Sequence, residues 1–200
     1  GLGDVYQRQV MVIEQDTDGI ICSGGDPQEI FNLVQAALPA GIVIDLDFVD
    51  HDVYVPKPKN YLLFKPDGTV KKVGLFRKRN RVGLFNEFTV EYIRHYLTSE
   101  EKAEEYYQDI CDRLINRTID IDLLKITQRI SKSDKRLTGA GIGKHGQKVT
   151  YYEGEEPRFH AQTGVPLKSV RKPVIEGDYF IDWYLDKVTK AHAQILEIIN

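Results

Sequence analysis

Apolar positions in the first part of the chain occur in short alternating runs, a pattern typical of β-strands separated by turns. The runs Val10 to Ile13 and Ile20 to Cys22 flank the tetrapeptide Asp16-Thr17-Asp18-Gly19. Because an Asp-Gly pair favours the tight turn of a hairpin, we expect two antiparallel strands with two aspartates at their tip.

The following residues predict a helix and then further strands. Asp26 to Ala37 begins with an Asp-Pro pair and places its apolar residues on one stripe, which indicates a helix. Ile42 to Val55 alternates as one or two strands. Tyr61 to Phe64 and Val70 to Phe76 flank the turn Pro66-Asp67-Gly68, which predicts a second hairpin.

The apolar period becomes helical in the second part of the chain. Leu84 to Leu97 and Ser99 to Arg117 predict two helices, and Asp122 to Ile130 continues the helical pattern. Val149 to Tyr152 is strand-like, and an amphipathic helix from about Tyr179 to Ile199 ends the chain.

This change of period places a boundary near Thr98. We therefore expect an α+β protein, with an antiparallel sheet and helices in residues 1–98 and a mainly helical region in residues 99–200. A chain of 200 residues with 42% hydrophobic content is long enough to bury a core. No apolar stretch approaches the roughly 20 residues of a membrane-spanning helix, and no signal segment is evident, so we expect a cytoplasmic protein without membrane contact.

Positive charge is concentrated in three blocks, although the formal net charge of the chain is only −3. Residues 57–81 hold nine Lys or Arg against one acid, and residues 125–148 hold seven against one. Residues 157–172 hold four and no acid. Because phosphate contacts need dense Lys and Arg, blocks that alternate with acidic segments favour a surface that follows a polyanion.

The two hairpin aspartates form a candidate metal site. Asp16 and Asp18 are two positions apart, so their side chains lean to the same side of an extended chain. Like charges held that close repel unless a cation neutralises them, and carboxylate oxygens suit Mg²⁺. The alternative is that Asp and Asp-Gly serve here only as ordinary turn residues.

Two further motifs offer competing interpretations. Thr138 to Gly146 is Gly-rich, but it has Thr138 and His145 where a Walker loop needs Gly and Ser or Thr, so we expect a turn there that is flexible or faces DNA. Asp16 to Gly19 resembles the nucleophile motif of haloacid dehalogenase phosphatases, and Gly177 to Asp182 resembles their metal motif. That resemblance implies a phosphorylated Asp16, Asp18 as general acid and Asp182 on Mg²⁺, within a parallel sheet.

Taken in order, the motifs of the whole chain resemble the C-terminal part of a family B DNA polymerase. Val12 to Cys22 is similar to the hairpin that carries the motif Tyr-Gly-Asp-Thr-Asp-Ser, from which Glu14, Gln15 and Gly19 depart. Pro58-Lys59-Asn60-Tyr61 resembles the Lys-Lys-Arg-Tyr motif that contacts the duplex near the primer end. Three later stretches resemble the thumb that grips the duplex: Asp122 to Leu137, Gln147 to Tyr152 and Asp178 to Tyr184.

This resemblance implies that residues 1–98 are the end of a polymerase palm and residues 99–200 a thumb. Asp16 and Asp18 would then be catalytic and would bind two Mg²⁺ ions. The implied partners are primer-template duplex DNA, a deoxynucleoside triphosphate and the N-terminal polymerase portion. The implied DNA-binding residues are Lys57, Lys59, Tyr61, Arg77, Arg79, Lys125, Lys132, Lys135 and Arg136.

The motif with the other essential metal-binding aspartate is missing from these residues. We therefore expect the isolated chain to be inactive as a nucleotidyltransferase. A DNA-binding module without catalysis stays open as an alternative.

Overall fold

The computed structural model describes residues 10–16, 19–49, 51–77, 82–133, 138, 141–155 and 168–200, with the side chain of Asp16 left out. The chain forms two compact units, residues 1–78 (unit 1) and, apart from Ile199, residues 79–200 (unit 2). This division falls earlier than the predicted change near Thr98. The reason is that α2 (Gly83–Tyr96) packs on α3 (Glu100–Ile115), so the two helices share one unit.

Unit 1 begins with the predicted hairpin and helix. Strands β1 (Met11–Asp16) and β2 (Gly19–Ser23) pair antiparallel, with Asp16 opposite Gly19 and a register shift between Val12 and Glu14. Helix α1 (Pro27–Ala37) follows, and its N-cap Asp26 accepts a hydrogen bond from the backbone N–H of Glu29. Both elements are confirmed.

The strand expected from Ile42 onward is wrong in its first half. Residues 42–49 form no strand, and regular pairing begins only at β3 (Asp52–Lys57). The side chain of Gln35 takes the place of a neighbouring strand, because its amide nitrogen donates to the carbonyl oxygen of Ile42 and its amide oxygen accepts from the N–H of Ile44. The alternating pattern of residues 42–49 therefore did not lead to strand pairing.

The remainder of unit 1 is an antiparallel meander of β3, β4 (Asn60–Phe64) and β5 (Val70–Lys72). The predicted hairpin is confirmed for β4 and β5, but Gly74–Arg77 forms a short 3₁₀ helix and does not extend the strand. The buried apolar residues described in this unit are Leu62, Leu63 and Phe76.

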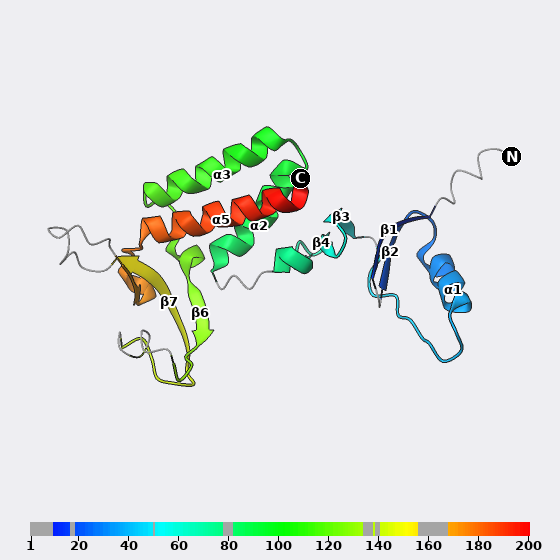
Figure 1. Cartoon of the computed structure of the whole chain (residues 1–200), viewed down its shortest axis with the longest axis horizontal. Coiled ribbons are helices and arrows are strands. Elements are labelled where there is room, and N and C mark those ends of the chain that lie inside the picture. The colour runs from blue at the N-terminus through cyan, green and yellow to red at the C-terminus, as the bar shows by residue number, and fades with distance from the viewer. Residues whose placement is uncertain are drawn as a thin grey trace. The chain divides into compact units, whose positions relative to one another are not determined.

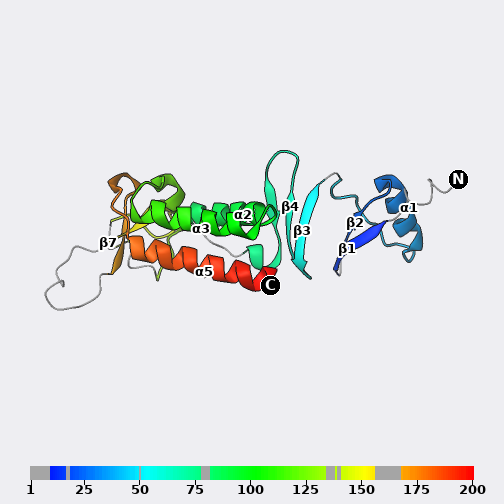
Figure 2. The same ribbon diagram turned by 90° about the horizontal axis from the view of Figure 1, so that it is seen from above.

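Unit 2 is built on three helices that lie side by side, α2, α3 and α5 (Ile181–Ile199), as both views show (Figures 1 and 2). All three are confirmed. Ser99 caps α3 by accepting from the N–H of Lys102. Their facing sides bury a large apolar core, which includes Phe88, Leu114 and Val188.

Unit 2 also contains a three-stranded antiparallel sheet, of which only the strand-like stretch Val149 to Tyr152 was predicted. A 3₁₀ turn (Ile121–Leu124) leads into β6 (Ile126–Arg129), so the helix predicted over Asp122 to Ile130 is wrong. The side chain of Asp120 caps this single turn, and the β-branched residues after it pair with β7 (Lys148–Glu155). β7 also pairs with β8 (Ser169–Lys172), after which a second 3₁₀ turn (Val174–Glu176) precedes α5.

Buried tyrosine hydroxyls join this sheet to the helices. Tyr184 Oη on α5 donates to the carbonyl oxygen of Leu124 and accepts from the N–H of Glu153 on β7. Burial raises the pKa of Tyr184, so its hydroxyl stays protonated as a donor. The described chain is therefore α+β with antiparallel sheets, and none of its described helices is long and apolar enough to cross a membrane.

Candidate nucleic-acid interface

The hairpin of the predicted metal site forms, but Gly19 belongs to β2 and lacks positive φ, so it is not a residue of the tight turn that the Asp-Gly pair predicted. β1 ends at Asp16, β2 begins at its partner Gly19, and the sequence between them is Thr17-Asp18. Thr17, Asp18 and the side chain of Asp16 lie outside the described residues, so the roles of both aspartates stay predictions. No cluster of three potential metal ligands occurs among the residues the structure does describe. The two carboxylates suit a hard cation chemically.

The turn between β3 and β4 presents the Lys-Lys-Arg-Tyr-like motif. Lys59 is exposed and has φ of 62°, in the left-handed backbone region that residues other than glycine rarely adopt. Asn60 braces this turn, because its side chain donates to the carbonyl oxygen of Pro58 and accepts from the N–H of Leu75. A side chain at Gly74 would clash with the Lys59 carbonyl oxygen, which explains the glycine there.

The structure brings this turn to the aspartate hairpin. The backbone N–H of Lys59 donates to Glu14 Oε1 on β1 at 2.9 Å, across a sequence separation of 45 residues. Two motifs that the sequence analysis treated separately therefore lie together within unit 1. Glu14 is a site residue that sequence reasoning noted only as a departure from the polymerase motif.

The other predicted contacts of unit 1 lie on the same sheet or directly after it. Lys57 is exposed at the end of β3, Tyr61 is half-buried on β4, and Arg77 is exposed at the end of its 3₁₀ helix. Arg79 lies outside the described residues.

In unit 2 the predicted DNA-binding residues have different surroundings. Lys125 Nζ lies 2.6 Å from Asp122 Oδ1, so this lysine already has an acidic partner. Lys132 is exposed just beyond β6, whereas Lys135 and Arg136 lie outside the described residues.

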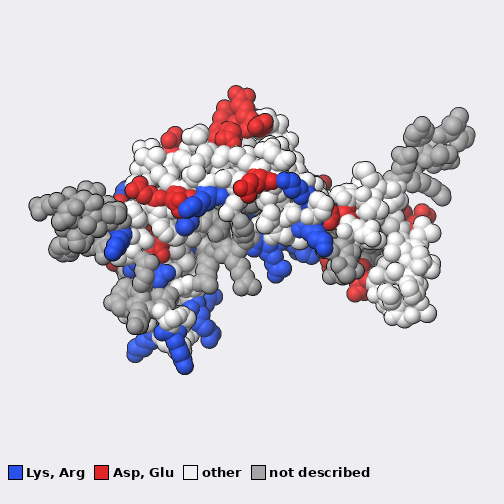
Figure 3. Space-filling view, in the orientation of Figure 1, with Lys and Arg blue, Asp and Glu red and all other residues white. Residues whose placement is uncertain are grey.

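Sequence reasoning missed three cations that flank Lys132. Arg129 is directly opposite Lys148 in the β6–β7 ladder, and Lys144 lies in the turn that joins these strands. We call the exposed set Arg129, Lys132, Lys144 and Lys148 the basic tip. Figure 3 shows Lys and Arg gathered at this end of the β6–β7 hairpin, while Asp and Glu side chains gather along α3. Charge counting had found the block, but only the strand register shows which residues face each other.

The basic tip has an unfavourable electrostatic feature. Like charges directly opposite in an antiparallel pair are destabilising. Within the part of the chain that the structure describes, none of its four cations forms an ion pair with an acid. Phosphate groups would relieve this repulsion, so the arrangement suits a polyanion.

The third basic block has structural roles at Arg171 and Lys172. Arg171 Nε lies 3.3 Å from Oε1 of the buried Glu153, and its guanidinium lies over the ring of Tyr151. Lys172 pairs with Asp178 and Glu176. These two cations hold β8 and the following turn, so charge at these two positions does not indicate a ligand.

The competing motifs gain no support from the geometry. Residues 141–147 form the turn before β7, where the N–H of Gly146 donates to the carbonyl oxygen of Ile130. Asp178 pairs with Arg117 and Lys172, and Asp182 is exposed in the first turn of α5. All described strand pairs are antiparallel, unlike the parallel sheet that the phosphatase resemblance implies.

Comparison with known proteins finds similarity to solved structures. No protein-family model matches the chain, and no curated protein matches it. Among solved structures, the family B DNA polymerase from the hyperthermophilic archaeon Pyrobaculum calidifontis is similar, with a TM-score of 0.62 and 20% sequence identity. The similarity covers 100% of this chain and 28% of that one. At this identity the likeness shows a shared fold.

Proposed function

We propose that this chain is the palm end and thumb of a template-directed DNA polymerase of the family B type. The observation that carries the proposal is that the whole chain has the fold of part of such a polymerase. The order of the sequence motifs agrees with it, since the Asp-Thr-Asp hairpin precedes the Lys59 turn and the basic tip follows both.

The catalytic contribution of this chain would come from its hairpin. Asp16 and Asp18 would hold Mg²⁺, which would supply charge stabilisation for transfer of a nucleotidyl group from a deoxynucleoside triphosphate to the primer. Carboxylates on a paired hairpin suit this role because the ladder fixes the backbone that carries them.

Duplex binding would come from Lys59, the cations near it and the basic tip. These side chains are exposed Lys and Arg on strand ends and turns, a type of group that contacts phosphates and carries no sequence information. Such contacts suit an enzyme that copies any template. The acidic face of α3 would lie away from the duplex, because phosphates repel it.

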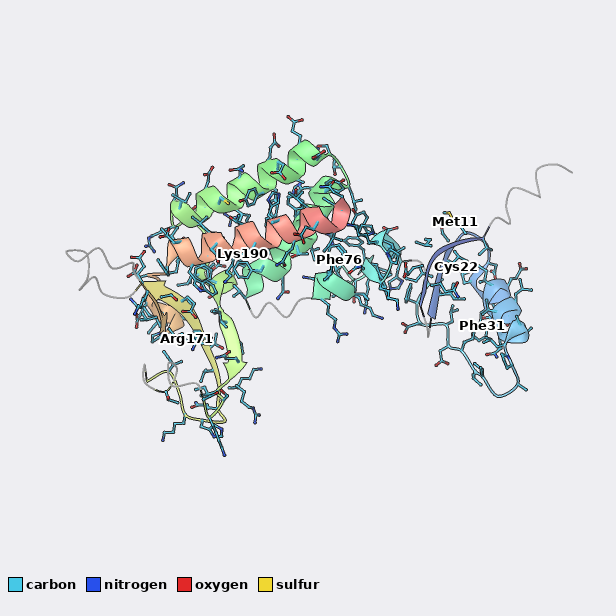
Figure 4. The ribbon with its side chains drawn as sticks, viewed as in Figure 1. Met11, Cys22, Phe31, Phe76, Arg171 and Lys190 are labelled. Carbon is cyan, nitrogen blue, oxygen red and sulfur yellow. The ribbon has the colours of Figure 1, made fainter. Side chains whose placement is uncertain are left out.

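The hairpin and α1 also need more protein around them. No described residue between 10 and 49 is buried. Met11 on β1, labelled in Figure 4, is 63% exposed, and Leu33 on α1 is 72% exposed. A two-stranded hairpin alone is only marginally stable in water. We therefore expect the remaining polymerase portion to cover these apolar side chains, and the present chain by itself to synthesise no DNA.

The first test is binding of duplex primer-template DNA, measured by fluorescence anisotropy across a salt series. Affinity should be independent of sequence and fall steeply with salt. Lys132→Ala should lower the slope of log affinity against log salt by about one. Lys190→Ala is the matched control, because that exposed lysine pairs with Asp186 on α5, and its slope should not change.

The second test adds the remaining polymerase portion and measures primer extension. Synthesis should appear with Mg²⁺ and be abolished by Asp18→Asn, while duplex binding is retained. Binding without synthesis under any condition would favour the non-catalytic module. Mg²⁺-dependent release of phosphate from small esters by the isolated chain, abolished by Asp16→Asn, would favour the phosphatase.

A further inference from the structure

Glu14 joins two separate functional motifs through one hydrogen bond. It is half-buried on β1, two positions before Asp16, and its Oε1 accepts from the N–H of Lys59 at 2.9 Å. The polymerase motif that this hairpin resembles has tyrosine at the position of Glu14. This contact therefore depends on a residue at which the chain departs from that motif.

The contact acts on a turn that the backbone alone does not favour. A residue other than glycine is strained in the left-handed region, and such a conformation persists only where its surroundings hold it. Lys59 is in that region with φ of 62°. Asn60 and the close approach of Gly74 hold the turn from the side of β4 and β5, and Glu14 holds it from the side of β1.

We infer that Glu14 is a positioning residue that fixes the Pro58–Lys59 turn beside the Asp16 hairpin, so that the ammonium group of Lys59 meets a backbone phosphate of the bound duplex. The phosphate contact rests on the proposed function, whereas the tie between Glu14 and Lys59 does not. The hydrogen bond of Glu14 is made to a peptide group. Its effect on DNA is exerted through Lys59.

Simple electrostatics predicts the opposite effect, which makes the inference testable. A carboxylate near a polyanion repels it, so removal of Glu14 for charge reasons alone would strengthen DNA binding. Loss of a positioning contact would instead weaken binding, because the Lys59 turn would become disordered before DNA is bound. Glutamine separates the two effects, since it removes the charge but keeps an oxygen that can accept the Lys59 hydrogen bond.

The first experiment compares Glu14→Ala and Glu14→Gln by amide hydrogen exchange of the full chain, without DNA. Exchange at the Lys59 amide should become about tenfold faster in Glu14→Ala, as expected for loss of a hydrogen bond to a charged acceptor. It should stay close to wild type in Glu14→Gln. An unchanged Lys59 exchange rate in Glu14→Ala would overturn the tie.

The second experiment measures duplex affinity for the same variants. Glu14→Ala should weaken binding about threefold to tenfold, and Glu14→Gln should restore it. In a Lys59→Asn background, where asparagine tolerates the left-handed backbone, Glu14→Ala should have no further effect. Equal strengthening by both Glu14 variants would show a charge effect only and overturn the positioning role.

Two further outcomes are informative. Broadening of hairpin resonances by Mn²⁺ that is lost in Glu14→Gln would make Glu14 a metal ligand and overturn the inference. Absence of duplex binding by the wild-type chain at low salt would overturn both the proposed function and the phosphate contact. The exchange result would still decide whether Glu14 fixes the turn, so the two failures remain distinguishable.

Discussion

The first forty described residues and the helical bundle of unit 2 have similar apolar content but bury it very differently. Among the described residues, every buried apolar side chain except Leu62, Leu63 and Phe76 belongs to unit 2. The β1–β2 hairpin and α1 instead expose residues such as Val12, Ile20 and Leu33. Unit 2 therefore carries its own core, whereas the hairpin region has the character of a fold completed by another segment.

This difference explains where candidate chemistry is found. The hairpin bears the aspartates but lacks a core to hold them, and its polar tie to Lys59 compensates only locally. The basic tip projects from a sheet that buried tyrosines join to α3 and α5. Under the proposed function, we expect unit 2 with its basic tip to be stable alone and the aspartate hairpin to become rigid only when the remaining polymerase portion is present.

The largest predicted effect tests this contrast with matched leucines. Leu114→Ala on α3, where the side chain is fully buried, should destabilise unit 2 by about 2–5 kcal/mol. Leu33→Ala on α1 should change stability by at most about 0.5 kcal/mol. Trp183, the only tryptophan, lies in unit 2 and reports its unfolding in urea, while hydrogen exchange reports α1.

A large loss of stability from Leu33→Ala in the isolated chain would contradict the view that α1 lacks a core of its own. Addition of the remaining polymerase portion should change the effect of this substitution. Leu33→Ala should then weaken association, because the side chain would have become buried at the new interface.

The next effect concerns two glycines of unit 1 that share a positive φ. Gly74 and Gly68 have φ of 66° and 83°, but only at Gly74 would a side chain meet other atoms, the Lys59 carbonyl oxygen and Asn60 Oδ1. Gly68→Ala should cost about 1 kcal/mol from backbone strain alone. Gly74→Ala should cost about 1–3 kcal/mol more, because the Lys59 turn must move.

Hydrogen exchange of the amides in the β3–β5 sheet, recorded at a series of temperatures, measures the stability of both variants. Equal losses would mean that the Lys59 turn adapts freely. That result would remove the evidence that unit 1 holds this turn rigidly.

A pH-dependent effect of intermediate size is expected in unit 2. Tyr92 on α2 donates to Glu104 on α3, and His192 Nε2 on α5 lies 2.7 Å from the same carboxylate oxygen, so one cluster joins three helices. Desolvation raises the pKa of Glu104, but the hydrogen bonds from Tyr92 and His192 outweigh it and lower the pKa below its usual value. A carboxyl with a lowered folded pKa adds stability above its unfolded pKa of about 4.3, and this stability is lost as pH falls through the folded pKa.

Glu104→Gln should therefore destabilise unit 2 at pH 7, and the difference from wild type should shrink as the pH falls below about 4. Urea denaturation followed by Trp183 fluorescence at a series of pH values measures it. A difference that stays constant down to acid pH would show that the carboxylate charge does not contribute.

Helices and strands of this chain differ in how well the sequence predicts them. Helices α1, α2, α3 and α5 were predictable because their periodic apolar residues act locally, and α1 and α3 also begin at the capping residues Asp26 and Ser99. Residues 42–49 and Asp122 to Ile130 were misjudged because strand pairing depends on distant partners: Gln35 satisfies the first segment, and β7 pairs with the second.

The candidate site shows the same distinction between local motifs, which the sequence reveals, and long-range contacts, which it does not. The aspartate hairpin and the Lys59 motif were visible in the sequence, but the contact that joins them spans 45 residues and could not be read from it. The opposition of Arg129 and Lys148 likewise requires the β6–β7 register.

The smallest predicted effect concerns that opposed pair and separates stability from function. Replacement of Lys148 by glutamine and then by glutamate should first remove and then reverse the repulsion from Arg129. Because opposite charges across a strand pair contribute roughly 0.2–1 kcal/mol, Lys148→Glu should slightly stabilise unit 2 against urea. Duplex affinity should fall in the same order, since each step removes positive charge from the basic tip.

A variant that loses stability and affinity together would mean that Lys148 serves the fold. Opposite changes in the two quantities would mean that the hairpin tolerates repulsion because its ligand relieves it.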